Sequence, residues 1–250
     1  LGDVYKRQEM KSEAKVTKTK VFNVIILDRS GSMATIRSAA IGGLNETLVS
    51  IQKAQEKFSD TQEHFVSLVM FCSCETKLFF DKLPVRKAHP LKWNDYEPCC
   101  CTPLFDAMGF TLTAMRKYIK GMEDVAVMVT IITDGLENAS KEYNGQAIKR
   151  LVEELRGEGW SFTYMGANQD AVEVAMNMSI RNSRNFEYND AGTRESMRKD
   201  SCTRMNFFTK LADFKRAEYE CSRAPMSVEK RRKCYTSMAD EAFDEEESKS

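Results

Sequence analysis

The chain has 250 residues, of which 42% are hydrophobic and 30% charged, as in ordinary globular proteins. Its 37 basic and 37 acidic residues give a formal net charge of zero, which argues against a nucleic-acid-binding surface. No apolar run approaches the ~18 residues that a membrane helix needs, and the N-terminus lacks the apolar core of a signal peptide.

The first structured element is predicted at Val21–Leu27, a continuous apolar and β-branched run typical of a strand buried on both faces. Residues 1–8 resemble translated vector sequence, and residues 9–20 are polar and Lys-rich. We therefore expect residues 1–20 to be a disordered or artefactual lead-in. Residues 33–58 then carry apolar side chains at helical spacing. The pair Gly42-Gly43 within them would let this helix approach the sheet closely.

Two further strands are predicted at His64–Phe71 and Thr76–Phe80. The link between them is too short for a parallel crossover, so they are expected to form an antiparallel hairpin. Residues 81–101 read as one long loop with three prolines, and a loop of that length is more often functional than incidental.

The rest of the chain alternates helices with apolar strands. Helices are predicted at Pro103–Lys120, Glu142–Arg156, Asp170–Met178 and 190–214, and strands at Val125–Ile132, Trp160–Met165 and Arg184–Tyr188.

This order predicts an α/β fold of the Rossmann-like, doubly wound type. We expect a mainly parallel six-stranded sheet with one antiparallel edge strand and helices on both faces. The domain is expected to span residues 21–214. Residues 215–250 have lost the apolar period and carry runs of like charge, so they are predicted to be a charged, disordered tail.

Three polar clusters follow predicted strands or the long loop, where ligands bind in doubly wound sheets. The first contains Asp28, Ser30 and Ser32, directly after the first strand. Thr102 ends the long loop, and Asp134 follows the strand Val125–Ile132. Carboxylate and hydroxyl oxygens are the ligands that a hard cation such as Mg²⁺ prefers.

These clusters resemble the metal-ion-dependent adhesion site (MIDAS) of von Willebrand factor A (vWA) domains, which has Asp-x-Ser-x-Ser on one loop, Thr on a second and Asp on a third. The resemblance spans roughly residues 21–214 and is to a cytoplasmic member of the bacterial type. Small glycines commonly precede the Thr in the family, whereas here it follows Cys99-Cys100-Cys101.

The resemblance implies a role for each residue. Ser30, Ser32 and Thr102 would coordinate Mg²⁺, or Mn²⁺, through their hydroxyls, and Asp28 and Asp134 would supply negative charge, at least one of them through a water. The implied function is metal-dependent binding to an Asp or Glu of a partner protein, with no catalysis, no nucleic acid and no membrane.

Each motif also has a simpler reading. Asp28 and Ser30 could cap a helix, and Asp134-Gly135 could be a plain turn. Asp106 reads as an ordinary acid of a first helical turn, or as outer support of the site. Asp170 reads as a helix cap, with Asn168 a minor candidate at the rim of the site.

The eight cysteines include Cys72-x-Cys74 and the triplet 99–101. Neither has the usual spacing of zinc ligands, and no His lies nearby in sequence, so we favour reduced thiols in a cytoplasm over zinc.

An enzyme is the alternative to an interaction module, namely a Mg²⁺-dependent phosphohydrolase or phosphotransferase with Asp28 as nucleophile. That reading leaves the three hydroxyls without a role, and the sequence offers no phosphate-binding glycine loop. A structural protein that has lost its metal is disfavoured because all five ligand positions carry suitable oxygens.

Overall fold

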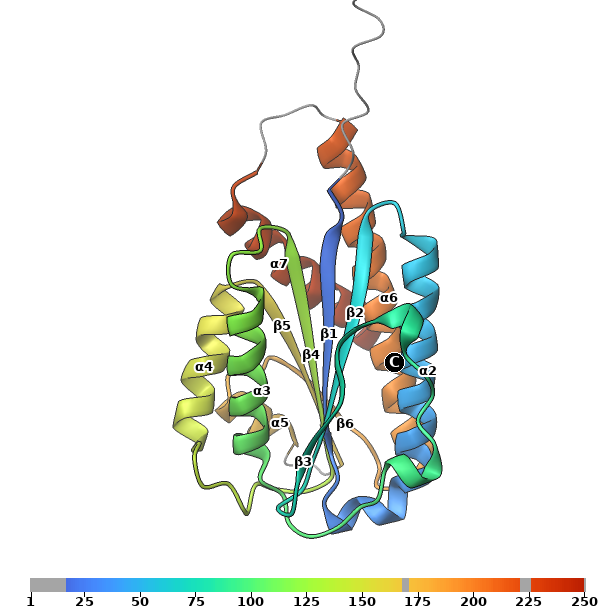
Figure 1. Cartoon of the computed structure of the whole chain (residues 1–250), viewed down its shortest axis with the longest axis vertical. Coiled ribbons are helices and arrows are strands. Elements are labelled where there is room, and N and C mark those ends of the chain that lie inside the picture. The colour runs from blue at the N-terminus through green and yellow to red at the C-terminus, as the bar shows by residue number, and fades with distance from the viewer. Residues whose placement is uncertain (1–16, 168–170, 221–225, 250) are drawn as a thin grey trace, which may run out of the picture.

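The fold is built on one six-stranded sheet, seen in a computed structural model that describes residues 17–167, 171–220 and 226–249 (Figure 1). The strand order is β3-β2-β1-β4-β5-β6, and all neighbours are parallel except β2 and β3. The predicted fold class is therefore confirmed. The strands are β1 (Thr19–Asp28), β2 (Gln62–Phe71), β3 (Thr76–Pro84), β4 (Val125–Thr133), β5 (Trp160–Gly166) and β6 (Asn182–Asn185).

Helices cover both faces of the sheet, with α3 and α4 on one side and α2 and α6 on the other (Figure 1). The short 3-10 helices η1, η2 and η3 lie in the connections. The helices are η1 (Gly31–Ile36), α2 (Arg37–Lys57), η2 (Val85–Lys87), η3 (Trp93–Asp95), α3 (Leu104–Ile119), α4 (Gly145–Gly157), α5 (Ala171–Asn177), α6 (Asp190–Glu220) and α7 (Val228–Glu247).

The apolar strand β1 lies at the centre because both of its faces are buried. Val21 and Ile25 belong to the core under α2, α6 and α7, and Phe22 and Val24 belong to the core under α3, α4 and α5. This alternation follows from the two-residue period of a strand.

The chain turns to opposite sides of β1, with β2 on one side and β4 on the other. In parallel register, Leu27 of β1 pairs with Ile132 of β4. The loops after β1 and β4 therefore leave the sheet next to each other, at the switch point where doubly wound folds bind ligands.

The antiparallel hairpin is also present, but β3 continues to Pro84, beyond the predicted end at Phe80. The long loop is less irregular than expected, since it contains η2 and η3. The side chain of Asn45 on α2 holds it by hydrogen bonds to the backbone N–H and carbonyl of Leu91, at 2.7 and 3.0 Å.

The glycine pair of α2 serves a different contact from the one predicted. A Cβ added at Gly43 would lie 2.0 Å from Sδ of Met197, so this glycine lets α6, and not the sheet, approach α2. Gly42 has no such neighbour within 4 Å.

The edge strand β6 begins and ends earlier than the predicted Arg184–Tyr188. The helix expected from Asp170 is α5, and its predicted cap Asp170 lies outside the described residues, as does Asn168. Of the predicted lead-in, residues 1–16 also lie outside them, and β1 starts two residues before Val21.

A disordered tail from residue 215 is the clearest wrong prediction. Helix α6 continues to Glu220, and residues 228–247 form α7, which packs on the sheet. The buried side chains of α7 recur at helical spacing, but most of its other residues are charged and hid this narrow stripe. The stripe consists of Tyr235, Ala239, Ala242, Phe243 and Glu246.

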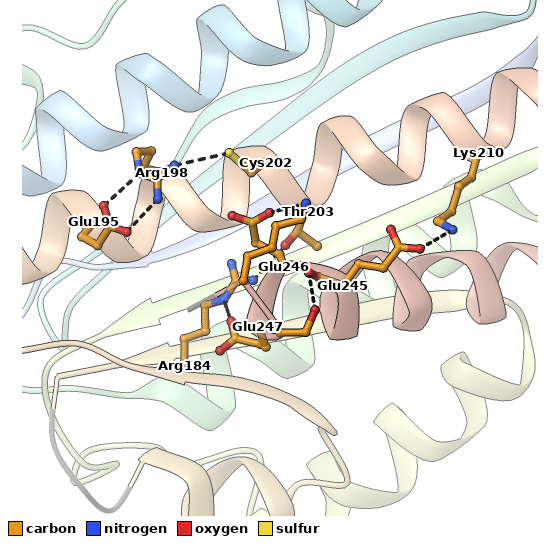
Figure 2. Close-up of polar contacts among 11 residues, drawn as sticks. Arg184, Glu195, Arg198, Cys202, Thr203, Lys210, Glu245, Glu246 and Glu247 are labelled. Carbon is orange, nitrogen blue, oxygen red and sulfur yellow. Dashed lines mark hydrogen bonds and ion pairs between the residues drawn. The ribbon is translucent and has the colours of Figure 1, made fainter.

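Ion pairs join α7 to its neighbours, as Figure 2 shows. Lys210 of α6 bonds to Glu245 at 2.8 Å, and Arg184 of β6 bonds to Glu247 at 2.6 Å. Arg184 also lies over the ring of Phe243, 4.6 Å from its centroid. The charged residues that suggested disorder are therefore used in docking this helix.

Helix α6 is tied to the sheet by the fully buried Arg204. Its guanidinium bonds to Asp200 at 2.8 Å on the same helix, to Asn23 of β1 at 2.8 Å and to Thr130 of β4 at 2.5 Å. A buried charge is stable only when it is paired and fully hydrogen-bonded, which these three partners provide.

Within the described part of the chain, no helix is both long and apolar enough to cross a membrane.

Replacing Tyr235 by Ala tests whether α7 belongs to the folded domain. Tyr235 is 1% exposed and its hydroxyl bonds to Asp124 at 2.8 Å, so we expect a loss of about 3–5 kcal/mol in the free energy of unfolding by urea. Ser237→Ala, on the exposed side of the same helix, should change it by less than about 0.5 kcal/mol. Equal, small effects of the two substitutions would show that α7 does not pack as described.

Candidate metal centre

The carboxylate of Asp28 links the two loops at the switch point. Asp28 ends β1 and is fully buried. Its Oδ1 accepts a hydrogen bond of 2.7 Å from the backbone N–H of Ser30, and its Oδ2 accepts one of 2.7 Å from the hydroxyl of Thr133 at the end of β4. The first bond shapes the loop, and the second holds that loop against the neighbouring strand.

Burial makes the charge on Asp28 costly. It raises the pKa of Asp28 from 3.8 to about 6, although the hydrogen bonds from Thr133 and Ser30 act in the opposite direction. The adjacent cationic group of Arg29 is directed elsewhere, to Glu75 at 3.1 Å and to the sulfur of Cys72 at 3.5 Å. A cation bound beside Asp28 would remove this cost.

Hydrogen bonds connect the loop after β1, here called the first loop, to the loop after β4. The hydroxyls of Ser30 and Ser32 are 3.1 Å apart, and the hydroxyl of Ser32 donates to Oδ1 of Asp134 at 2.8 Å. The other oxygen, Oδ2 of Asp134, is buried and has no hydrogen-bond partner among the residues that the structure describes. Unpartnered buried polar atoms are rare, and a missing ion is one of their ordinary explanations.

Thr102 completes the group from the third segment. It is buried, and its backbone is fixed by Asn138, which bonds to its N–H at 2.9 Å and to its carbonyl at 3.1 Å. A Cβ added at Gly135 would lie 3.4 Å from Oγ1 of Thr102 and 3.8 Å from Oγ of Ser32. Gly135 therefore leaves open the space that these two hydroxyls border.

The structure thus brings all five predicted residues together from three segments of the chain. They present two carboxylates and three hydroxyls, and one carboxylate oxygen is still free. Oxygen-only donor sets fit hard cations such as Mg²⁺ or Mn²⁺. The five are Asp28, Ser30, Ser32, Thr102 and Asp134.

The loop after β4 is held by two acids. Asp106 accepts hydrogen bonds of 2.8–2.9 Å from the backbone N–H groups of residues 141–143. Burial alone would raise the pKa of Asp106, but these bonds outweigh it and lower the pKa. Glu137 accepts similarly from Phe105 at 2.8 Å and from Ser140 at 2.6 Å. Asp106 is therefore an anchor of this loop, rather than only a first-turn helix acid.

Two tyrosines at the site were not predicted from the sequence. The buried hydroxyl of Tyr96 donates to the backbone carbonyl of Asp28 at 2.5 Å. The hydroxyl of Tyr188, after β6, donates to the carbonyl of Ser32, and Tyr188 is 42% exposed. Because they lie 68 and 156 residues from their partners, no local pattern could identify them.

The cysteine triplet leaves Thr102 in place and braces the first loop. The N–H of Cys99 donates to the carbonyl of Arg29 at 2.8 Å, and the N–H of Gly31 donates to the carbonyl of Cys100 at 3.0 Å. The departure from the glycines common in the vWA family is therefore accommodated by the backbone.

Solved structures of several proteins share this fold. A pilus adhesin from Lactobacillus rhamnosus GG aligns with a TM-score of 0.53 at 14% identity, over 77% of this chain and 31% of the adhesin. The manganese-loaded TRAP protein of Plasmodium vivax aligns with a TM-score of 0.50 at 16% identity, over 73% of each chain.

Proximal thread matrix protein 1 from the mussel byssus, solved with zinc in its MIDAS motif, aligns with a TM-score of 0.50 at 14% identity. The alignment covers 74% of this chain and 45% of the mussel protein, so the chain spans less than half of that relative. No protein-family model and no curated protein sequence matches the chain. The structural likeness shows the fold, which is that of vWA domains.

Replacing Asp28 by Asn tests the cost of its buried charge. Because the folded-state pKa is raised, ionisation destabilises the metal-free protein: the cost is absent below about pH 4 and complete above about pH 7, where it reaches about 3 kcal/mol. In EDTA, Asp28→Asn should therefore gain stability relative to the wild type as the pH rises across this range. Urea unfolding at several pH values measures the difference, and parallel profiles would contradict it.

Proposed function

We propose that the chain is a metal-dependent protein-interaction module that binds Mg²⁺, or Mn²⁺, at this site and an Asp or Glu of a partner protein. The observation that carries the proposal is the convergence of five oxygen-bearing side chains from three segments, of which the hydroxyls of Thr102 and Ser32 border the space at Gly135. Two proteins with the same fold hold manganese or zinc, which supports a divalent cation here.

In this proposal the hydroxyls of Ser30, Ser32 and Thr102 hold the ion, and Asp28 and Asp134 supply negative charge. Oδ2 of Asp134 is the oxygen best placed to serve the ion, directly or through water, because it has no hydrogen-bond partner in the described part of the chain. Both oxygens of Asp28 are already engaged by Ser30 and Thr133, so its charge acts mainly by attraction.

Neutral hydroxyls leave the bound cation electron-poor. When bound, Mg²⁺ would offer a coordination position to a carboxylate from outside, since it requires six oxygen ligands. Metal binding and partner binding then strengthen each other by the same factor.

A phosphohydrolase has less support from the geometry. A nucleophilic Asp28 would have to release at least one of its hydrogen bonds, and it is fully buried. The two histidines are engaged elsewhere: His64 is buried against Gln62 and Phe208, and His89 packs on Phe79 and Phe80. Arg29 is also engaged elsewhere, because it bonds to Glu75 and contacts Cys72.

The proposed partner is a protein, because the chain has no net charge to attract nucleic acid. The proposed setting is the cytoplasm, where thiols stay reduced.

Divalent metal should raise the melting temperature of the full chain. At a concentration near 100 times Kd, Mg²⁺ adds about 2.7 kcal/mol of stability, which corresponds to a rise of roughly 5–10 °C. Asp134→Ala should remove most of this rise, whereas Asp81→Ala, at an exposed position of β3, should retain it. Differential scanning calorimetry in Mg²⁺ and in EDTA gives the comparison. A wild-type melting temperature that ignores millimolar Mg²⁺ and Mn²⁺ would refute the metal site.

The interaction itself is tested by capture from the lysate of the native host in Mg²⁺ and in EDTA. We expect one partner to be retained by the wild type only in Mg²⁺ and to be lost with Thr102→Ala, because one hydroxyl ligand is removed. Mutating the partner's acidic residues should abolish capture. Metal-dependent turnover of phosphoesters that requires Asp28 would instead favour the enzyme.

A further inference from the structure

Four thiols from two loops meet beside the candidate metal centre. Cys72 and Cys74 lie on the turn between β2 and β3, and Cys99 and Cys100 lie on the loop that precedes α3. The sulfurs of Cys72 and Cys99 are 3.3 Å apart, and those of Cys74 and Cys100 are 2.7 Å apart. The sulfurs of Cys72, Cys74 and Cys99 all lie within 4.8 Å of one another.

The backbone holds the two loops in register. The N–H of Ser73 donates to the carbonyl of Cys101 at 3.0 Å, and the N–H of Cys101 donates to the hydroxyl of Ser73 at 3.1 Å. The β2–β3 turn is closed by mutual backbone bonds between Cys72 and Glu75, at 3.0 and 3.2 Å. The thiols therefore lie on a short turn and on the end of the long loop, and backbone hydrogen bonds join these two segments.

The backbone of Cys100 is strained in a way that serves the cluster. Its φ is +62°, in the left-handed region that costs an L residue other than glycine roughly 1–2 kcal/mol. In this conformation its sulfur reaches Cys74 while its carbonyl bonds to Gly31. Such strain persists where other interactions hold the residue in place. A bond from the sulfur of Cys100 to a metal would be an interaction of this kind.

We infer that Cys72, Cys74, Cys99 and Cys100 bind Zn²⁺ as a closed tetrathiolate site, separate from the oxygen site of Asp28 and Asp134. Four sulfurs at about 2.3 Å from zinc lie about 3.8 Å from one another. The separations of 3.3 Å (Cys72–Cys99) and 2.7 Å (Cys74–Cys100) are shorter than that, so a bound ion would draw the sulfurs of each pair apart by about an ångström or less. Zinc prefers thiolates, whereas Mg²⁺ prefers oxygen, so the two sites select different ions.

Charge also fits this assignment. Zn²⁺ with four thiolates carries a net charge of −2, after the thiols release their protons to solvent. The guanidinium of Arg29 is 3.5 Å from the sulfur of Cys72 and is mostly buried, so it offsets part of that charge. Partners of this kind orient and support metal ligands from outside the coordination sphere.

Zinc would fix two loops of the candidate adhesion site at once. Cys99 and Cys100 bond to Arg29 and Gly31 of the first loop, and only Cys101 separates them from Thr102 in the chain. A metal cross-link would then stand before Thr102, where vWA domains commonly carry small glycines. This consequence rests on the function proposed above, whereas the zinc site itself does not.

Zinc content of the full chain tests the inference. The protein is purified under reducing conditions with Zn²⁺, dialysed, and analysed by mass spectrometry of the metal. We expect one tightly held zinc per chain, and a fall of about tenfold or more in the double variant Cys74→Ser/Cys100→Ser. Cys202→Ser on α6 is the matched control and should keep its zinc.

Asp134→Ala separates the two sites, because zinc can also occupy an oxygen site. Zinc that survives Asp134→Ala but not the double cysteine variant supports the thiolate site. Zinc lost with Asp134→Ala but retained by the double variant overturns it and leaves the proposed function standing.

Cobalt gives a second readout that does not depend on the folding of any variant. Wild-type protein loaded with Co²⁺ should show the sulfur-to-cobalt charge-transfer band and the strong visible bands of a tetrahedral thiolate complex. Absence of these bands, or four thiols that pair as disulfides and hold no metal after reduction, would overturn the inference.

Discussion

The buried carboxylate of Asp28 is the interaction on which the rest of the site depends. It ends the central strand, and its two oxygens hold the loop at Ser30 and the neighbouring strand at Thr133. Among the described residues no basic side chain is paired with it, since Arg29 is directed to Glu75 and Cys72. The metal-free fold therefore keeps negative charge where desolvation is costly, and a bound cation would relieve that cost.

The polar groups of the site lie close together because β2 and β4 are added on opposite sides of β1. Adjacent parallel strands release their loops at one edge, and Arg204 beneath them ties α6 to both β1 and β4. The loop after β4 is then bonded from outside by Asp106 and Glu137. Rigid support of this kind is what fixed ligand geometry requires.

Two donor sets lie side by side at this edge. The hydroxyls of Thr102 and Ser32 border the space at Gly135, and thiols gather between the β2–β3 turn and the loop before α3. The backbone bonds between Cys99 and Arg29, and between Cys100 and Gly31, connect them mechanically. Hard and soft ligands bind different ions, so the two sites need not compete.

The sequence by itself determined the layers of the fold, because strand periodicity is a local property. It also singled out the five oxygen-bearing residues through short motifs such as Asp28-x-Ser30, and the structure shows that they lie close together. It did not determine that residues 228–247 form a docked helix, since the stripe around Tyr235 has meaning only beside α6 and the sheet. Tyr188 at the site and the meeting of Cys74 with Cys100 were likewise decided by tertiary structure. Contacts between distant segments depend on the register and packing of the whole sheet, which no spacing along the chain encodes.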